Sequence, residues 1–223
     1  MRLTKHILTL ALYALAMFAL PKLTYQVVTL FGVQDRAAII VTMNTVSYAF
    51  MAVVCLKLHG KSLLDDLKRI TSFPKFLVWI TLGWIGLLIM AFLAGLVIYF
   101  LRGGSQQSLN QQSIDTVRQA YPFLMGTTTI ILAPFIEEMV FRRSLMTALE
   151  RFPLLSILAS TLLFGLIHVI SGGDYIFLIS YAAMGFPLTI AYFKTRNICY
   201  PIGIHMMQNT YAVLMMILSY FLI

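Results

Sequence analysis

The sequence is poor in charged residues. Only 11% of its 223 residues are Asp, Glu, Lys or Arg, whereas 60% are hydrophobic and the mean hydropathy is +0.88. A soluble domain usually carries about 25% charged residues. This composition excludes a soluble globular protein, because the polar surface is too small, and it predicts an integral membrane protein.

Cysteine is also scarce. Only Cys55 and Cys199 are present, and they form no CxxC or similar metal-ligand spacing. This excludes a disulfide framework and argues against a cysteine zinc site. Acidic residues number 8 against 16 Lys and Arg, which gives a net charge of +8. Such an excess can indicate a nucleic-acid partner, but the positions of the basic residues explain it differently.

Long apolar stretches fill most of the chain. A helix that crosses a ~30 Å hydrocarbon core needs about 20 mostly apolar residues, and the lack of period-2 alternation favours helices over a barrel. We therefore expect an all-α fold, a polytopic transmembrane helix bundle of about seven spans. The expected spans are residues 7–30, 37–58, 76–101, 121–150, 154–170, 175–193 and 201–223.

Some segments leave alternatives open. The first stretch contains Pro21 and should kink or end early there, and the basic residues before it also allow a signal peptide. A retained helix is favoured because apolar sequence continues beyond any plausible cleavage point. Residues 65–70 are expected to form a short interfacial helix or a solvated loop. Residues 102–115 are expected to form a polar, flexible outer loop.

The basic residues orient the expected bundle. Twelve of them fall on one side: two at the N-terminus, five over residues 57–75, three over 142–151 and two at 194–196. Arg36, Arg102 and Arg118 fall on the other side, and Lys22 is ambiguous. The positive-inside rule then predicts a cytoplasmic N-terminus and an external C-terminus. This topology explains the net positive charge without a nucleic-acid partner, and contact of the basic residues with anionic headgroups of the lipid bilayer is a secondary effect.

A few ionisable residues lie inside the expected spans. Each costs at least ~2.5 to 3.5 kcal/mol on insertion scales and is a functional candidate for that reason. Residues four apart share a helix face, so Glu138 and Arg142 should pair, whereas Glu137 has no local cation. His6 and His59 lie beside basic loops and need no special role. The candidates are Glu137, Glu138, Arg142, Arg143, His168 and His205, joined by the polar Asn209.

The spacing of these residues predicts how they meet. Glu137 lies 15 residues before residue 152 and His168 lies 15 residues after Pro153, so each is about 22 Å from the expected turn. An antiparallel hairpin would place them at the same height. His205 and Asn209 share one helix face. His205 lies near the cytoplasmic end, which requires either a turn that dips into the bundle or a cleft open to the cytoplasm.

Each candidate also has a structural interpretation. The four charges of the fourth span could form an ion network, and His168 could pack in the core with a hydrogen bond to a backbone carbonyl. His205 and Asn209 could join helices by hydrogen bonds worth about 0.6 to 2 kcal/mol. The combination of such residues on three separate spans favours a functional site.

Three short motifs resemble those of a known family. EEMVFR (137–142), FGLIH (164–168) and HMMQN (205–209) are similar to the EExxxR, FxxxH and HxxxN motifs of the CPBP family (CAAX protease and bacteriocin-processing), also called Abi or type II CAAX prenyl endopeptidase-like. The resemblance covers residues 121–223. It implies a catalytic core over residues 120–223, preceded by transmembrane helices without an identifiable motif over residues 1–119.

The resemblance implies a glutamate-dependent peptidase. In that scheme Glu137 is the general base on a water molecule and His168 positions or polarises the water. His205 and Asn209 hydrogen-bond the developing oxyanion, a role worth several kcal/mol per donor.

The resemblance also implies supporting roles. Glu138 and Arg142 would orient the catalytic side chains, and Phe164 would pack beside His168. No cofactor is expected. Zinc is the alternative, with Glu137, His168 and His205 as ligands, but the chain has no HExxH motif.

The sequence thus predicts an intramembrane endopeptidase, multi-pass in a bacterial plasma membrane, that cleaves a peptide or membrane-associated protein near the cytoplasmic face. The alternative is a non-catalytic membrane protein that acts in bacteriocin immunity or modulates a membrane sensor. A transporter that uses Glu137 and His168 as a proton relay is disfavoured, since neither a repeat nor paired broken helices are evident.

Overall fold

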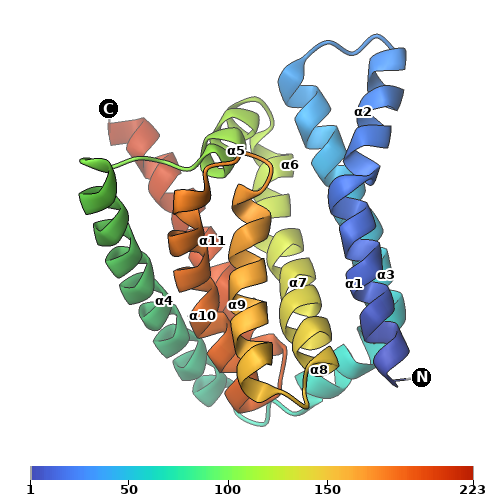
Figure 1. Cartoon of the computed structure of the whole chain (residues 1–223), viewed down its shortest axis with the longest axis vertical. Coiled ribbons are helices and arrows are strands. Elements are labelled where there is room, and N and C mark those ends of the chain that lie inside the picture. The colour runs from blue at the N-terminus through green and yellow to red at the C-terminus, as the bar shows by residue number, and fades with distance from the viewer. Residues whose placement is uncertain (1, 223) are drawn as a thin grey trace.

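The computed structural model describes residues 2–222, with side chains from residue 3 to residue 218, and contains no β-strand in that range (Figure 1). The protein is an all-α polytopic bundle. Five helical stretches of the described chain are long and apolar enough to cross a membrane, and the apolar helix Pro153–Val169 is shorter. The count of seven spans stays a prediction. The five stretches are Leu3–Leu30, Arg36–Lys68, Phe73–Arg102, Pro122–Ala148 and Tyr175–Thr195.

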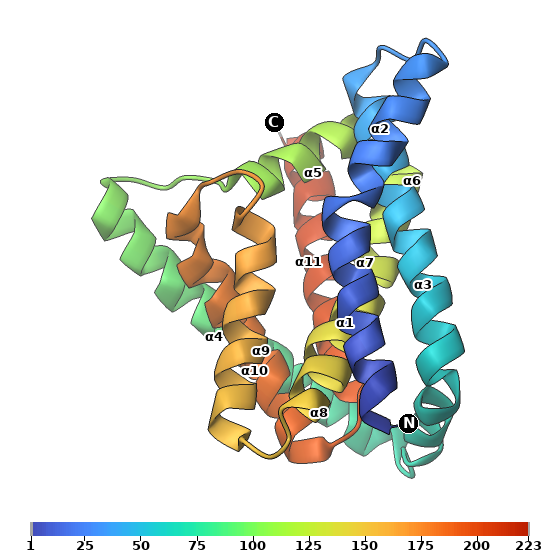
Figure 2. The ribbon, with the colours of Figure 1, turned by 45° about the vertical axis from the view of Figure 1, so that its right-hand side comes forward.

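The N-terminal helices form one side of the bundle. α1 (Arg2–Phe18) and α2 (Leu20–Leu30) are separated at Ala19, because Pro21 occupies the first turn of α2. The expected break in the first stretch is therefore observed. Both helices run beside α3 (Arg36–Lys68), as Figures 1 and 2 show.

α3 is longer than the sequence suggested. Residues 65–68 form its last turn, so this segment is helical and not a loop, and it is continuous with the span. The reason is tertiary: Asp66 is only 2% exposed and accepts a hydrogen bond from the backbone N–H of Ile198 at 3.0 Å. Burial of this carboxylate fixes the turn against the start of the last helix.

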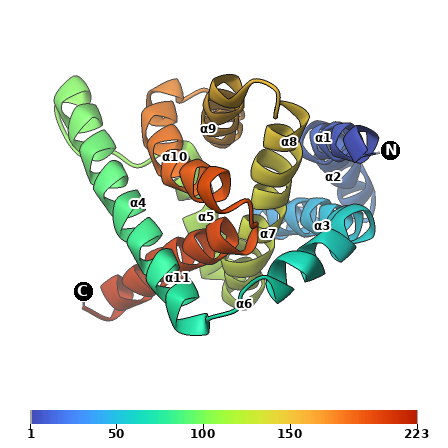
Figure 3. The ribbon, with the colours of Figure 1, turned by 90° about the horizontal axis from the view of Figure 1, so that it is seen from below.

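The other side of the bundle contains α4 (Phe73–Arg102), α9 (Pro153–Val169), α10 (Leu178–Thr195) and α11 (Cys199–Leu222). α10 packs between α9 and α4, and α11 lies against α4, as seen from below in Figure 3. A single turn of 3₁₀-helix, η3 (Tyr175–Phe177), leads into α10.

The span between these groups alternates between α- and π-helix. It consists of α6 (Pro122–Thr127), π-helix η1 (Thr128–Leu132), α7 (Ala133–Glu137), π-helix η2 (Glu138–Leu145) and α8 (Met146–Ala148). Short π segments are rare and frequently mark functional sites. The expected turn at residues 151–153 is observed, since α9 begins at Pro153.

The expected outer loop is observed only over residues 103–108, and the prediction was wrong for residues 109–115, which are helical. α5 (Leu109–Ala120) crosses one end of the bundle (Figures 1 and 2). Ser108 caps it by accepting from the N–H of Gln111 at 3.2 Å. Val117 packs with Val41 and Met125 in a small apolar cluster. A mostly polar sequence forms a helix here because one apolar face is buried against the bundle.

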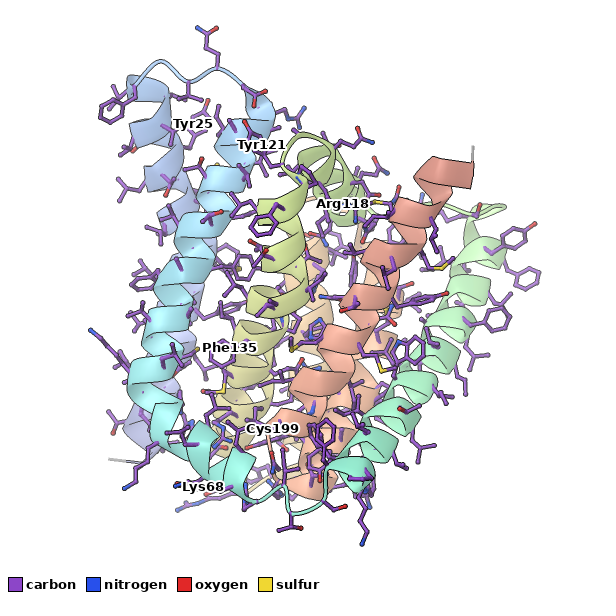
Figure 4. All side chains as sticks on the ribbon, turned by 180° about the vertical axis from the view of Figure 1, so that it is seen from behind. Tyr25, Lys68, Arg118, Tyr121, Phe135 and Cys199 are labelled. Atoms are coloured by element: carbon purple, nitrogen blue, oxygen red, sulfur yellow. The ribbon has the colours of Figure 1, made fainter. Side chains whose placement is uncertain are left out.

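The basic turns gather at the end opposite α5. α1 begins at that end, and the α3–α4, α8–α9 and α10–α11 turns lie there too (Figures 1 and 2). In Figure 4, Lys68 and Cys199 mark this end, while Arg118 and Tyr121 mark the other. The expected grouping of basic residues is therefore seen, and we call this the basic end. Its cytoplasmic location stays a prediction.

Candidate active site

Two histidines converge on Glu137, the last residue of α7. The Oε2 of Glu137 lies 3.9 Å from the Nε2 of His168 on α9 and 3.9 Å from the Nε2 of His205 on α11. Glu137 is 4% exposed and His205 is 6% exposed. The structure thus brings together residues from three helices, and Glu137 and His168 lie at the same height as the hairpin spacing predicted.

Hydrogen bonding fixes the orientation of the His168 ring. Its Nδ1 lies 2.7 Å from the backbone oxygen of Phe164. A carbonyl only accepts, so Nδ1 carries the hydrogen and Nε2, in the neutral ring, presents a lone pair toward Glu137. The ring of Tyr181 on α10 stacks on the imidazole ring of His168, with centroids 4.5 Å apart and an angle of 17° between the ring planes. The carbonyl contact expected of a packed histidine is present, but it leaves Nε2 for chemistry.

Glu138 holds the second histidine. The Nδ1 of His205 lies 2.9 Å from the Oε1 of Glu138, and the same oxygen accepts from the Nη1 of Arg142 at 3.1 Å. Glu138 and Arg142 are both 0% exposed. The predicted Glu138–Arg142 pair is observed. The same pair orients the His205 ring, because the hydrogen bond from Nδ1 to Glu138 leaves the Nε2 atom directed at Glu137.

Arg142 joins this pair to the aromatic core of the site. Its Nη2 donates to the backbone oxygen of Gly185 at 2.8 Å, and its guanidinium lies 4.4 Å from the centroid of the Phe164 ring. Phe164 lies beside His168, with centroids 4.9 Å apart, as the resemblance implied. A β-carbon at Gly185 would lie 2.6 Å from Phe164, so the close approach of α10 requires glycine.

Asn209 forms a hydrogen bond to the irregular part of the fourth span. In π-helix η1 the N–H of Ala133 donates to the oxygen of Thr128, five residues back. The next carbonyl, that of Thr129, would pair with Pro134, which has no N–H. The Nδ2 of Asn209 donates to this oxygen instead, at 2.7 Å. One amide hydrogen of Asn209 is therefore structural, and its second hydrogen and its oxygen remain for the cavity that it lines.

Arg143 belongs to a separate network. It forms an ion pair with Asp66, which also pairs with Arg69. These contacts tie η2 to the basic end of α3. Of the four charges in EEMVFRR, Arg143 is thus a structural tether, and its partner Asp66 could not be identified from sequence because it lies 77 residues away in the chain.

A cavity of about 240 Å³ extends from Glu137 toward α5. Its walls include Tyr48 of α3, whose hydroxyl lies 3.5 Å from the Oε1 of Glu137, and the buried Arg118 of α5. Burial lowers the pKa of the Arg118 guanidinium below its ordinary value, while the carboxylate of Asp115 opposes that shift. The cavity extends away from the basic end, so the expected cleft toward the cytoplasmic turns does not describe it.

Three of these residues escaped sequence reasoning: Tyr48, Tyr181 and Arg118. A phenol inside a span and an arginine in an apparently polar loop are weak signals alone, and only the fold places them on one cavity.

A metal site receives no geometric support. Among the residues that the structure describes, no group of three or more His, Cys, Asp or Glu side chains has an arrangement suited to a metal ion. Zinc on Glu137, His168 and His205 therefore stays an alternative for experiment.

The C-terminal part of the chain is similar in sequence to known membrane proteins. Residues 119–211 match the family described as type II CAAX prenyl endopeptidase Rce1-like. YdiL of Bacillus subtilis (strain 168), a proposed membrane peptidase, is 33% identical over 141 residues, which are 62% of this chain and 56% of YdiL. The chain therefore spans about half the length of that relative.

A second relative covers nearly the whole chain. The membrane-embedded CAAX protease MroQ of Staphylococcus aureus (strain USA300) is 25% identical over 230 residues, 98% of this chain and 91% of MroQ. No solved structure matches the chain. The three motifs, the matched family model and these bacterial relatives agree: this is a multi-pass protein of the bacterial plasma membrane whose residues 119–211 are similar to the CPBP family of CAAX-protease-like membrane proteins.

Proposed function

We propose that this protein is an intramembrane endopeptidase in which Glu137 activates a water molecule for attack on a peptide bond. One observation carries the proposal: the Oε2 of Glu137 faces the Nε2 atoms of His168 and His205, each at 3.9 Å. These separations exceed a direct hydrogen bond. One water oxygen about 2.8 Å from both Glu137 and His168 would fit between them.

Glu137 and His168 would share the water. Glu137 takes one proton as general base, and the lone pair on the Nε2 of His168 accepts a hydrogen bond from the other hydrogen. The oxygen then attacks the carbonyl carbon of the scissile bond. Protonated Glu137 returns its proton to the leaving amine when the C–N bond breaks, so the carboxylate is regenerated.

His205 and Asn209 would stabilise the oxyanion. Because the Nδ1 of His205 donates to Glu138, its Nε2 can donate only when the ring is doubly protonated. Asn209 would offer the amide hydrogen that Thr129 does not use. Donors placed in this way contribute about 2.7 to 4 kcal/mol each to transition-state stabilisation.

The test is the Glu137→Gln variant, expressed from the native locus with Glu150→Gln as control, since Glu150 is exposed and far from the site. Membrane and secreted peptides from cells with wild-type protein are compared with those from each variant. We expect substrates to persist uncleaved in Glu137→Gln cells and to be processed normally in Glu150→Gln cells. A Glu137→Gln protein that accumulates normally and retains full processing would overturn the proposal in favour of a non-catalytic role in immunity or sensing.

Chelation separates the zinc alternative. If water activation depends on Glu137 and His168 alone, purified protein should keep its activity after dialysis against a strong chelator. Loss of activity with recovery on addition of zinc would assign Glu137, His168 and His205 as ligands instead.

A further inference from the structure

The proposed active-site cavity has a cationic end. α5 crosses the bundle at the end opposite the basic turns (Figure 2), and its side chains Asn110, Gln111, Ile114 and Arg118 line the same cavity as Glu137. Arg118 is 5% exposed. An anionic group on a bound molecule would be repelled by the Glu137 carboxylate and attracted to Arg118, so the cavity is electrically polar along its length.

The guanidinium of Arg118 is held but not saturated. Its Nη2 donates to the Oδ1 of Asp115 at 2.9 Å. Asp115 also accepts from the Nε2 of Gln111 at 2.9 Å and from the Nε2 of Gln107 at 2.6 Å. The buried Nε of Arg118 has no hydrogen-bond partner among the described residues. Three donors thus share the carboxylate of Asp115, whose side chain is 27% exposed. The side chain of Arg118 is only 6% exposed and keeps an unused hydrogen-bond donor at the cavity wall.

On this basis we propose that Arg118 is a specificity residue, which binds a carboxylate of the peptide substrate beyond the scissile bond. The inference rests on the proposed peptidase function. A guanidinium presents donors in a planar fork that matches a carboxylate, and such charge-assisted hydrogen bonds are stronger than neutral ones. The carboxylate is either the C-terminus of the substrate or an Asp or Glu side chain. Both present the same group to Arg118.

The fold limits the distance between this carboxylate and the cleaved bond. Glu137 lies 16 residues after Tyr121, the residue that separates α5 from α6, so the helix rise between them is at most about 24 Å. An extended peptide spans that distance with about seven residues. Arg118 lies in the last turn of α5 and lines the same cavity as Glu137, so the bound carboxylate should lie within about seven residues of the scissile bond.

The test uses the full chain in lipid nanodiscs and a mixed-sequence peptide library with labelled N-termini. One half of the library has free C-termini and the other half has amidated C-termini. Each half is made with and without Asp and Glu. Cleavage products are identified by mass spectrometry, and kcat/KM is measured for the best substrates. We expect carboxylate-bearing peptides to be cleaved about tenfold or more faster than their neutral counterparts, chiefly through KM.

Variants assign this preference to Arg118. Arg118→Gln should cleave carboxylate-bearing peptides about as slowly as the wild type cleaves neutral ones, and Arg118→Lys should recover part of the preference. Asp115→Asn, which leaves Arg118 charged, should retain it. Arg102→Gln is the matched control, because Arg102 is an exposed arginine at the end of α4. Melting temperatures of the variants report folding.

The outcomes are distinguishable. A preference lost on amidation identifies the C-terminus as the ligand, and one lost only on removal of Asp and Glu identifies a side chain. Glu137-dependent cleavage with equal rates for acidic and neutral peptides in the wild type would overturn the role of Arg118 and leave the peptidase function intact. This arm needs no variant to fold. No Glu137-dependent cleavage of any library peptide would contradict the proposed function and the inference together.

Discussion

The ring of His205 is hydrogen-bonded to Glu138 and not to Glu137: its Nδ1 lies 2.9 Å from the Oε1 of Glu138, while its Nε2 is 3.9 Å from the Oε2 of Glu137. Two adjacent glutamates thus contact opposite nitrogens of one imidazole. Glu138 neutralises Arg142 and orients the ring, which leaves the Glu137 carboxylate directed into the cavity.

Glu138→Gln is expected to reduce stability as well as activity. It would leave the fully buried Arg142 without its counterion, and removal of one partner of a buried ion pair costs about 3 to 5 kcal/mol. Thermal unfolding in detergent should show a lowered melting temperature, whereas Glu137→Gln should melt near the wild-type temperature. Equal stability of the two variants would contradict this division of roles.

Tyr181 should act on His168 in two ways. Its ring stacks on the imidazole, and its hydroxyl is hydrogen-bonded to Ser108, the N-cap of α5, at 2.7 Å and to Asn110 of α5 at 3.2 Å. An aromatic pair of this kind is worth about 0.5 to 1.5 kcal/mol, or roughly 2- to 10-fold. We expect Tyr181→Ala to lower kcat by about that factor and Tyr181→Phe, which keeps the stack, to lower it less.

A kinetic comparison checks this ranking. If Tyr181 only fills space, Tyr181→Phe and Tyr181→Ala should change the melting temperature with no change in kcat per folded molecule. The active fraction is therefore measured for each variant, so that loss of protein is not counted as loss of catalysis.

Local spacing predicted part of this site. The i,i+4 pair Glu138–Arg142 follows from helix geometry, and the height match of Glu137 and His168 follows from equal distances to one turn. The break before Pro21 likewise follows from residue chemistry. These features depend on neighbours in sequence or on a single hairpin.

Other features depend on contacts between distant segments. α5 was missed because its sequence is mostly polar, and its burial depends on Val117 meeting Val41 of α3. Tyr48 and Tyr181 reach the site only after three helices have packed. The direction of the cavity was also missed, because the position of His205 in sequence carries no information on which end of the bundle α5 covers.

Gly185→Ala should disrupt the packing of Phe164 and Arg142 at the site. Its β-carbon would lie 2.6 Å from Phe164 and 3.4 Å from the Nη2 of Arg142. Overpacking of this kind typically costs about 1 to 3 kcal/mol. The control is Gly86→Ala in α4, where a β-carbon meets nothing within 4 Å. We expect a lower melting temperature and reduced activity for Gly185→Ala, and a neutral or slightly stabilising effect for Gly86→Ala. Similar behaviour of both variants would show that the α9–α10 contact is not tight.

The structural and catalytic roles of Asn209 can be separated by restoring a backbone donor. Asn209→Ala removes the hydrogen bond to the oxygen of Thr129, which Pro134 cannot replace. The expected cost is about 1 to 2 kcal/mol, with loss of activity. Pro134→Ala supplies an N–H in π-helical register with Thr129 and should recover stability in the double variant.

Activity should not return in that double variant if the second amide hydrogen of Asn209 binds the oxyanion. Thermal unfolding measures the stability coupling of the two positions as a double-mutant cycle, and peptide cleavage measures catalysis in the same samples. Pro134→Ala alone is the matched control and should keep most of the activity, because Asn209 is then still present. Recovery of both stability and activity in the double variant would reduce Asn209 to a structural partner of Thr129, leaving His205 as the donor to the oxyanion.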